Sequence, residues 1–283
     1  MNPQYPIFVP TKGRYKAPLT IKELERIKVP YTVVVEEQEV EEYRKVVHEG
    51  EILVLPHRDK GLIVTRNWIW DYAQHTLKVP YFWTIDDNVR HFYELNQNMK
   101  WYVTSGTFLH VMEDFCQRYE NVIIGGMQYE MFTPRKQKHP PFIPNTRIYS
   151  NMFIKADAPY RNQLFYNDDT DLCLRVLKDG NCTVLFNIYV AEKIQTMRIK
   201  GGMTDYYEQT NKRKEFADML QHAHPDVVKV VWKYHRWHHE VDYRPFRNNA
   251  FKLKEGVVIP QGPNDYGMKK IITTPLNLKP AKK

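Results

Sequence analysis

Short apolar runs recur through the first half of the chain, and polar or amphipathic segments separate them. Residues 5–10 (YPIFVP), 31–36 (YTVVVE), 51–56 (EILVLP) and 81–85 (YFWTI) are rich in β-branched or aromatic side chains, which is typical of buried strands. The intervening segments favour helix, and 61–77 reads as a loop that enters a helix. This alternation predicts βαβ units and a mostly parallel sheet.

One helix start has a recognisable local signature. Thr20 and Glu23 form the Thr-x-x-Glu pattern of a capping box, in which two side chains satisfy backbone N–H groups at the start of a helix. Leu19 and Leu24 lie at the spacing of a hydrophobic staple. We therefore expect a helix that begins at Thr20 and is held by its own cap.

The second half of the chain is less regular. Helical patterns cover 106–120 and 166–182, and the second has acids at its start and Gly180 past its end, as helix termini prefer. The loop 133–145 (TPRKQKHPPFIPN) is basic and rich in proline. Strands are expected within 121–132, which contains a Gly pair, 148–155 and 182–190.

Beyond about residue 200 the pattern becomes polar. We expect helices at 216–223 (FADMLQHA) and 227–243 (VVKVVWKYHRWHHEVDY), followed from about Lys269 by a loosely ordered basic tail. The predicted organisation is an α/β core over 1–200 and a helical, basic extension over 201–283.

Composition and charge narrow the class of protein. The chain has 283 residues and a formal charge of +8, which suggests an anionic partner such as nucleic acid or a nucleotide, or else a merely soluble basic protein. The cysteines Cys116, Cys173 and Cys182 form no CxxC pair, so neither a zinc site nor a disulfide framework is indicated. No apolar run reaches the ~18–20 residues of a membrane span. We expect a soluble cytoplasmic protein without a membrane partner.

Two carboxylates end the fourth apolar run. In open parallel sheets ligands bind beyond the carboxyl ends of the strands, so Asp86, Asp87 and Asn88 are expected on the ligand-binding edge. Their oxygens suit Mg²⁺ or Mn²⁺, which also accepts substrate phosphates. Taken alone the cluster favours a simple Asx turn.

A second acidic cluster, Asp168, Asp169 and Asp171, lies at the start of the helix expected at 166–182. Acids there are stabilised by the helix dipole, which is a sufficient structural explanation. Crowding also raises the pKa values of neighbouring carboxyls, and a base with a pKa near neutrality is useful in catalysis. One of these acids is therefore a candidate general base.

Basic residues are expected on the same edge of the sheet. Lys12 and Arg14 follow the first strand, and Lys60 and Arg66 flank the start of the helix in 61–77. Such side chains can clamp a diphosphate, although most surface Lys and Arg are simply solvated.

Two later segments carry weaker signals. The backbone amides of Lys200, Gly201 and Gly202 can close over phosphates, but a Gly pair also marks an ordinary turn. In YHRWHH, His238 is a candidate metal ligand, and contact with nucleic acid is at least as good an interpretation.

Together these motifs resemble GT-A glycosyltransferases. The order runs from Pro-Thr-Lys-Gly-Arg (10–14) through Lys60-Gly61 and Thr65-Arg66-Asn67 to Ile-Asp-Asp-Asn (85–88), and then to NDDTDLCLR (167–175). More narrowly, IFVPTKGR, TIDDN, NDDTDLCLR and KGGMTDYY make the chain similar to the TET-associated glycosyltransferases of bacteriophages, over roughly residues 5–195. The implied fold is GT-A, a Rossmann-like mixed, mostly parallel sheet flanked by helices.

The resemblance implies roles position by position. Thr11, Lys12 and Arg14, with Glu36, would face the uridine of a UDP-sugar, and Lys60 and Arg66 would contact its ribose or phosphates. Asp86 would touch the nucleoside, Asp87 or Asn88 would lie at a Mn²⁺ or Mg²⁺ ion, and Asp169 aligns with the base, beside Asp168. The family's DxD motif usually ends on an acid, whereas this chain has Asn88, a weaker ligand for a divalent cation.

The implied activity is sugar transfer, with inversion, to a hydroxymethylated pyrimidine such as 5-hydroxymethylcytosine in DNA. For a phage-encoded chain this would take place in the host cytoplasm. One alternative is a GT-A enzyme acting on a glycan or lipid-linked acceptor. Another is a nucleic-acid-binding protein without catalysis, which the paired acids disfavour because carboxylates repel a polyanion. A nucleotidyltransferase lacks support, because the chain has no Gly-rich phosphate loop of that class.

Overall fold

A single large sheet forms the centre of the computed structural model, which describes residues 1–96, 99–136, 138–194, 213–259 and 262. Its strand order is β3-β2-β1-β4-β9-β7-β10-β5-β6, and β8 pairs with β10. Strands β3, β2, β1 and β4 run parallel to one another. Strand β9 is antiparallel to both β4 and β7, and β5 is antiparallel to β10. The strands are β1 (Ile7–Pro10), β2 (Thr32–Val35), β3 (Glu51–Val54), β4 (Tyr81–Thr84), β5 (Val89–Asn96), β6 (Met99–Tyr102), β7 (Val122–Tyr129), β8 (Phe142–Pro144), β9 (Met152–Lys155) and β10 (Cys182–Lys193).

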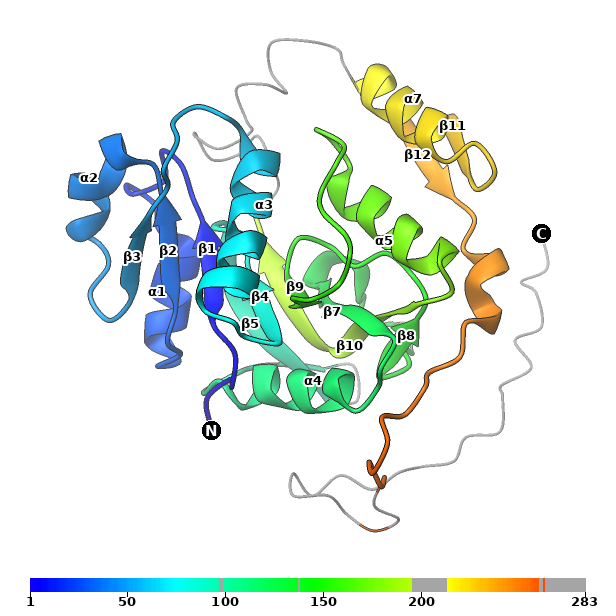
Figure 1. The fold of residues 1–283 in the computed structure, drawn as a ribbon, viewed down its shortest axis with the longest axis horizontal. Helices are drawn as coiled ribbons and strands as arrows, with labels where there is room; N and C mark the ends of the chain where they lie inside the picture. Colours follow the sequence, from blue (N-terminus) through cyan, green and yellow to red (C-terminus); the bar gives the residue numbers. More distant parts are fainter. Residues whose placement is uncertain (97–98, 137, 195–212, 260–261, 263–283) are drawn as a thin grey trace.

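Helices cover both faces of this sheet (Figure 1). Helices α1 and α4 pack in one hydrophobic cluster and α3 and α5 in another, on opposite faces. Strand side chains alternate between the clusters: Ile7 and Val9 enter the first, and Phe8 enters the second. The helices are α1 (Leu19–Arg26), α2 (Val40–Arg44), α3 (Leu62–Asp71), α4 (Thr107–Gln117), α5 (Asp168–Lys178) and α7 (Arg213–Ala223), with short helical turns at Glu37–Glu39, Tyr72–Thr76, Glu130–Phe132 and Arg244–Asn248.

The layered α/β architecture confirms the predicted fold class. All four apolar runs of the first half form strands. Strands β1, β2 and β4 are buried on both faces, which explains why they were visible in the sequence, whereas β3 is an edge strand with Glu51 and Val54 exposed. Strands β5 and β6 were not predicted, because polar and partly exposed residues interrupt their apolar positions, and β8 is a three-residue strand within the loop expected at 133–145. No helix among the described residues is long and apolar enough to cross a bilayer.

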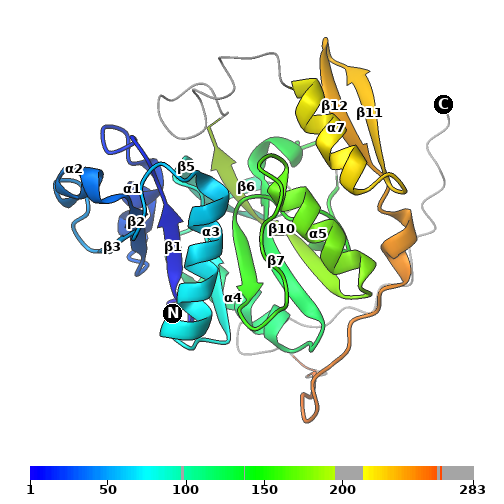
Figure 2. The same ribbon diagram turned by 45° about the horizontal axis from the view of Figure 1, so that its top comes forward.

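The prediction of a helix over 227–243 is wrong. This segment forms a hairpin of β11 (Val228–Lys233) and β12 (Arg236–Val241), which lies beside α7 in Figures 1 and 2. Its β-branched and aromatic residues favour a strand. The turn residues Tyr234 and His235 both adopt positive φ values (53° and 57°), a conformation usually taken by Asn-Gly, so the ordinary turn signal was missing.

The capping-box prediction at Thr20 is also wrong. Helix α1 begins at Leu19, and no side chain caps it. The Thr20 hydroxyl instead donates to the carbonyl of Asp86 (2.6 Å) and accepts from the amide of Val89 (3.0 Å). Glu23 accepts from the amide of Phe92 (3.0 Å). These side chains therefore brace the loop that carries Asp86, Asp87 and Asn88.

The glycine pair of β7 permits a close approach between strands. A Cβ on Gly126 would lie 2.3 Å from the carbonyl oxygen of Asn151, whose side-chain oxygen accepts from the Asp86 amide (3.1 Å). We expect Gly126→Ala to lower the free energy of unfolding by about 1–3 kcal/mol, because backbone must shift to admit the methyl group. Urea denaturation measures the loss, and Gly262→Ala, in open space, is the control. Equal stability of both variants would contradict the prediction.

Candidate active site

Both acidic clusters line one cavity of about 570 Å³ at the carboxyl ends of β1 and β4. Loops after β1 and β2, the start of α3 and the start of α5 surround it. The predicted site residues in its wall are Thr11, Lys12, Arg14, Glu36, Arg66, Asp86, Asp87, Asn88, Asp168 and Asp169. Lys60 is not in the wall, although its neighbours Asp59 and Gly61 are. Lys200, Gly201 and Gly202 lie outside the described residues.

The loop after β1 is fixed by ion pairs and by a buried tyrosine. Lys12 pairs with Glu36 (2.9 Å) and with Asp59. The Thr11 hydroxyl donates to Asp87 (2.7 Å) and lies 2.7 Å from the hydroxyl of Tyr43. The Thr11, Lys12 and Glu36 side chains thus line one wall, where the sequence predicted contacts to a nucleoside.

Asp86 lies between two cations. Lys193 Nζ is 2.5 Å from one of its carboxylate oxygens, and Arg66 is 3.3 Å from the other. Burial alone would raise the pKa of Asp86, but the charges of Lys193 and Arg66 outweigh it and lower that pKa to about 2. Asp86 is therefore anionic at neutral pH.

Asp87 and Asn88 have the chemistry expected of a cation site. Burial raises the pKa of Asp87 to about 6, against the opposing ion pair with Arg14. Asn88 donates through Nδ2 to the carbonyl of Ile194 (3.1 Å), and its Oδ1 is buried without a hydrogen-bond partner among the described residues. A hard cation would satisfy that oxygen and relieve the burial of Asp87, so these two side chains fit a divalent metal.

The structure does not bring His238 to these ligands. In β12, His238 accepts from Arg236 (2.9 Å) and its ring lies near Tyr234, both in its own hairpin. Its neighbour His239 feels the charge of Arg147 but does not line the cavity: burial, followed by that charge, lowers the pKa of His239 to about 4. No group of three or more metal-binding side chains occurs among the described residues.

Asp168 and Asp169 start α5, and each is paired with a different arginine. Asp168 pairs with Arg66, and Asp169 accepts from Nε (3.1 Å) and Nη2 (2.6 Å) of Arg147. Burial raises the pKa of Asp168 in spite of Arg66. Burial acts in the same sense on Asp169, but Arg147 outweighs it and lowers the pKa of that carboxyl. The shared Arg66 joins Asp168 to Asp86, whereas the ion pair of Asp169 is with Arg147.

The third acid of the cluster has a structural partner. Asp171 accepts from His224 (3.0 Å) and Arg175 (2.9 Å), and it does not line the cavity. His224 directly follows α7, so this contact fastens the C-terminal extension to α5. The predicted crowding of three acids therefore reduces to two in the site.

Two site cations were missed from the sequence. Lys193 ends β10 and Arg147 lies in the loop before β9, and each is isolated among residues that carry no motif. Tyr129 and Ser150 also line the cavity, and the Tyr129 hydroxyl lies 2.5 Å from Ser150 Oγ. No spacing rule would have found these residues, because only the tertiary fold brings them to the acids.

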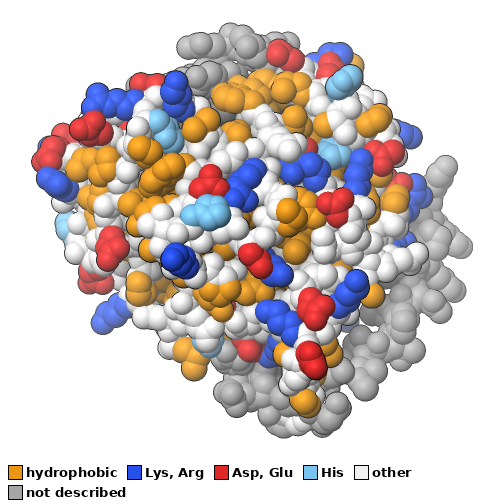
Figure 3. Space-filling model, in the orientation of Figure 1, with side chains coloured by type: hydrophobic (Ala, Val, Ile, Leu, Met, Phe, Trp, Pro, Cys, Tyr) orange, Lys and Arg blue, Asp and Glu red, His pale blue; other side chains and the backbone are white. Residues whose placement is uncertain are grey.

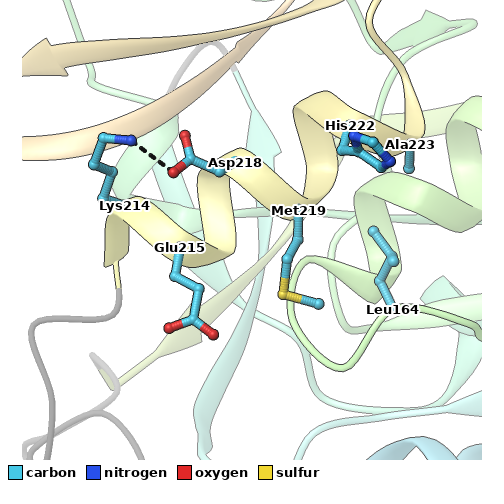
Figure 4. Close-up of a pocket in the computed structure, with 7 residues that line it drawn as sticks. All are labelled: Leu164, Lys214, Glu215, Asp218, Met219, His222 and Ala223. Carbon is cyan, nitrogen blue, oxygen red and sulfur yellow. Dashed lines mark hydrogen bonds and ion pairs between the residues drawn. The ribbon is translucent and has the colours of Figure 1, made fainter.

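A second hollow lies between α7 and the loop that carries Leu164 (Figure 4). Its walls include the ion pair of Lys214 with Asp218 (2.7 Å), together with Leu164 and Met219. None of the predicted site residues reaches it. Elsewhere, the face drawn in Figure 3 carries cations interspersed with acids and apolar side chains, so the positive charge does not form one continuous field there.

Comparison with known proteins gives one match that covers most of the chain. The model of the TET-associated glycosyltransferase family matches residues 5–202, which include both acidic clusters. No curated protein sequence matches the chain.

Among solved structures the likeness is distant. The structure of Staphylococcus aureus TarS 1-349 is 13% identical, with a TM-score of 0.40, over 78% of this chain and 66% of that one. TarS has also been solved with UDP. The complex of GalNAc-T7 with UDP, GalNAc and Mn²⁺ is 10% identical, with a TM-score of 0.45, over 70% of this chain and 44% of that one. This chain thus spans less than two thirds of either structure.

Proposed function

The chain belongs to the TET-associated glycosyltransferase family, and we propose that it transfers a sugar from a UDP-sugar to the hydroxymethyl group of a modified pyrimidine in DNA, with 5-hydroxymethylcytosine as the acceptor. The observation that carries this proposal is the single cavity in which residues of both acidic clusters meet three cations, the buried Arg66 and the partly buried Arg147 and Lys193. Such a cavity suits an anionic donor together with an acceptor that must lose a proton.

The donor would occupy the side of the cavity formed by β1, β2 and β4. Thr11, Lys12 and Glu36 would hold the uridine, with Lys60 and the backbone of Lys200, Gly201 and Gly202 closing on its phosphates. Arg66 is suited to a phosphate oxygen, because its Nε is buried without a hydrogen-bond partner among the described residues. A Mn²⁺ or Mg²⁺ ion held by Asp87 and Asn88 would neutralise charge on the leaving diphosphate.

The acceptor would approach from the side of Arg147. The Asp169 carboxylate would take the proton of the acceptor hydroxyl while that oxygen forms a bond to the anomeric carbon. The bond from this carbon to the diphosphate breaks, and its electron pair leaves with UDP. A single displacement of this kind inverts the configuration. Arg147 would hold Asp169 in position until the acceptor hydroxyl arrives.

Charge outside the cavity supports a DNA acceptor. Arg135, Lys136 and Lys138 are exposed in the loop after β7, and Trp232 and Tyr234 are exposed in the hairpin. Lys and Arg bind the phosphate backbone without reading sequence. We assign the donor site and catalysis to residues 1–200, and assign acceptor binding to the extension over 201–283 together with this loop.

The proposed activity can be tested with a panel of UDP-sugars and duplex DNA that carries 5-hydroxymethylcytosine. We expect nucleoside mass spectrometry to show the mass of one added sugar with at least one donor. Transfer should also fall steeply as salt rises, because phosphate contacts release counterions. Unmodified DNA is the control. Transfer to a glycan acceptor, with none to the modified DNA, would overturn the DNA assignment.

A further inference from the structure

Three aromatic rings form a stack beside the active site. Tyr129 ends β7, Phe132 ends the helical turn that follows, and Tyr149 lies in the loop before β9. The ring centroids of Phe132 and Tyr149 are 5.5 Å apart with an interplanar angle of 25°, and those of Tyr129 and Tyr149 are 4.6 Å apart at 30°. Tyr129 and Phe132 are also stacked, 6.3 Å apart at 22°. The ring planes thus lie within 30° of one another, and the three centroids form a triangle in which each ring borders the other two.

The stack leads directly to the proposed catalytic groups. The guanidinium of Arg147 lies 4.7 Å from the ring centroid of Tyr149, and the same guanidinium holds Asp169 (2.6 Å). Lys193 lies 5.2 Å from the ring of Tyr129 and pairs with Asp86. Tyr149 and Tyr129 thus contact the cations that hold the two acids.

The third ring, Phe132, is open to solvent. Phe132 is 48% exposed and the adjacent Met131 is 45% exposed, although both are apolar. Glu130, the acid nearest in sequence, pairs with Lys100 and so is neutralised. The exposed cations Arg135, Lys136 and Lys138 follow within six residues of Phe132. Among the described residues these three cations form no ion pair, and an aromatic surface next to such positive charge favours an aromatic polyanion over a neutral glycan.

We propose that Phe132, with Tyr129 and Tyr149 behind it, is the surface on which an unpaired nucleobase of the DNA acceptor stacks. This inference rests on the proposed function and names the part of the site that takes a base next to the modified pyrimidine. Bases present a π-face whatever their identity, so stacking positions the strand without requiring a sequence. A base turned out of the duplex loses its stacking partners, and these rings replace them. Arg147 lies between the rings and Asp169, so the stacked base flanks the modified pyrimidine, whose own hydroxyl reaches Asp169.

Binding of a single-stranded oligonucleotide that contains one 2-aminopurine tests this surface without requiring sugar transfer. Base–aromatic stacking contributes about 1–3 kcal/mol, so Phe132→Ala should raise the Kd by about 5- to 150-fold and remove the quenching of 2-aminopurine. Phe132→Trp should retain the wild-type Kd and the quenching of 2-aminopurine. UDP affinity should stay constant, because Phe132 lies outside the donor cavity.

Trp101→Ala is the matched control. Trp101 is 58% exposed on β6, and it points to the opposite side of that strand from Lys100, whose ammonium reaches Glu130. An unchanged Kd for Phe132→Ala, or an equal loss in Trp101→Ala, would overturn the proposal, as would an effect on a glycan acceptor alone. If binding of the oligonucleotide depends on Phe132 but the wild type transfers no sugar to modified DNA, then the proposed function is wrong and the stacking surface is still supported.

Discussion

Replacing Asp169 by Asn should lower kcat for sugar transfer by about 10²–10⁴-fold, because a positioned general base contributes on that scale. The amide has the size of the carboxylate but cannot take a proton at neutral pH. UDP should bind with nearly its original affinity, since Asp169 contacts Arg147 rather than the donor side of the cavity. Single-turnover transfer to 5-hydroxymethylcytosine DNA and calorimetric titration with UDP measure the two effects separately.

Asp168→Asn is the matched control for this result. Asp168 is adjacent to Asp169 in the sequence and is buried to a similar extent, but it pairs with Arg66, which also contacts Asp86. Its loss should weaken UDP binding more than Asp169→Asn does. If Asp169→Asn turns over normally while Asp168→Asn is inactive with UDP still bound, then Asp168 is the base and the assignment is reversed.

The second large effect is expected at Arg66. Arg66→Met leaves Asp86 and Asp168 buried with one cation fewer, and removing one partner of a buried ion pair typically costs about 3–5 kcal/mol of stability. Burial disfavours the charge of Arg66, but Asp168 and Asp86 more than compensate and raise its pKa. We expect a lower urea midpoint together with weaker UDP binding, because the variant also lacks the donor that we assign to phosphate.

Arg44→Met is the control for the ion pair itself. Arg44 pairs with Glu41 on the surface of α2 (2.7 Å), where both side chains are largely exposed, and such pairs contribute at most about 1 kcal/mol. Similar urea midpoints for Arg66→Met and Arg44→Met would show that the ion pairs of Arg66 do not stabilise the fold more than a surface pair does. Arg66→Lys separates charge from shape, because lysine keeps the charge but cannot bridge two carboxylates with a planar fork.

The core strands and the acidic cluster that follows β4 were accessible to sequence analysis for a common reason. A strand buried on both faces reads as a continuous apolar run, so its end is visible, and polar residues just beyond it fall on the ligand-binding edge. Asp86, Asp87 and Asn88 were found in this way. The family match over residues 5–202 then confirms the resemblance that those motifs suggested.

The partners of the acids were not accessible in the same way. Lys193 lies 107 positions from Asp86, and Arg147 lies 22 positions from Asp169. Neither separation corresponds to a helical or strand repeat, so only the packing of β10 and the β8–β9 loop brings these charges together. The hairpin was missed for a local reason, since Tyr234 and His235 are not residues that ordinarily mark a tight turn.

The bracing of the acidic loop by α1 has a consequence for the dynamics of the enzyme. The amide of Val89 is held by Thr20 Oγ, and the same hydroxyl holds the carbonyl of Asp86. Opening of the loop and separation of α1 from it therefore expose the same N–H to solvent. The hydrogen-exchange rate of the Val89 amide therefore reports the free energy of that opening. Val89 is fully buried and does not line the cavity. The Val89 amide is thus a native probe of loop order that requires neither a label nor a substitution in the site.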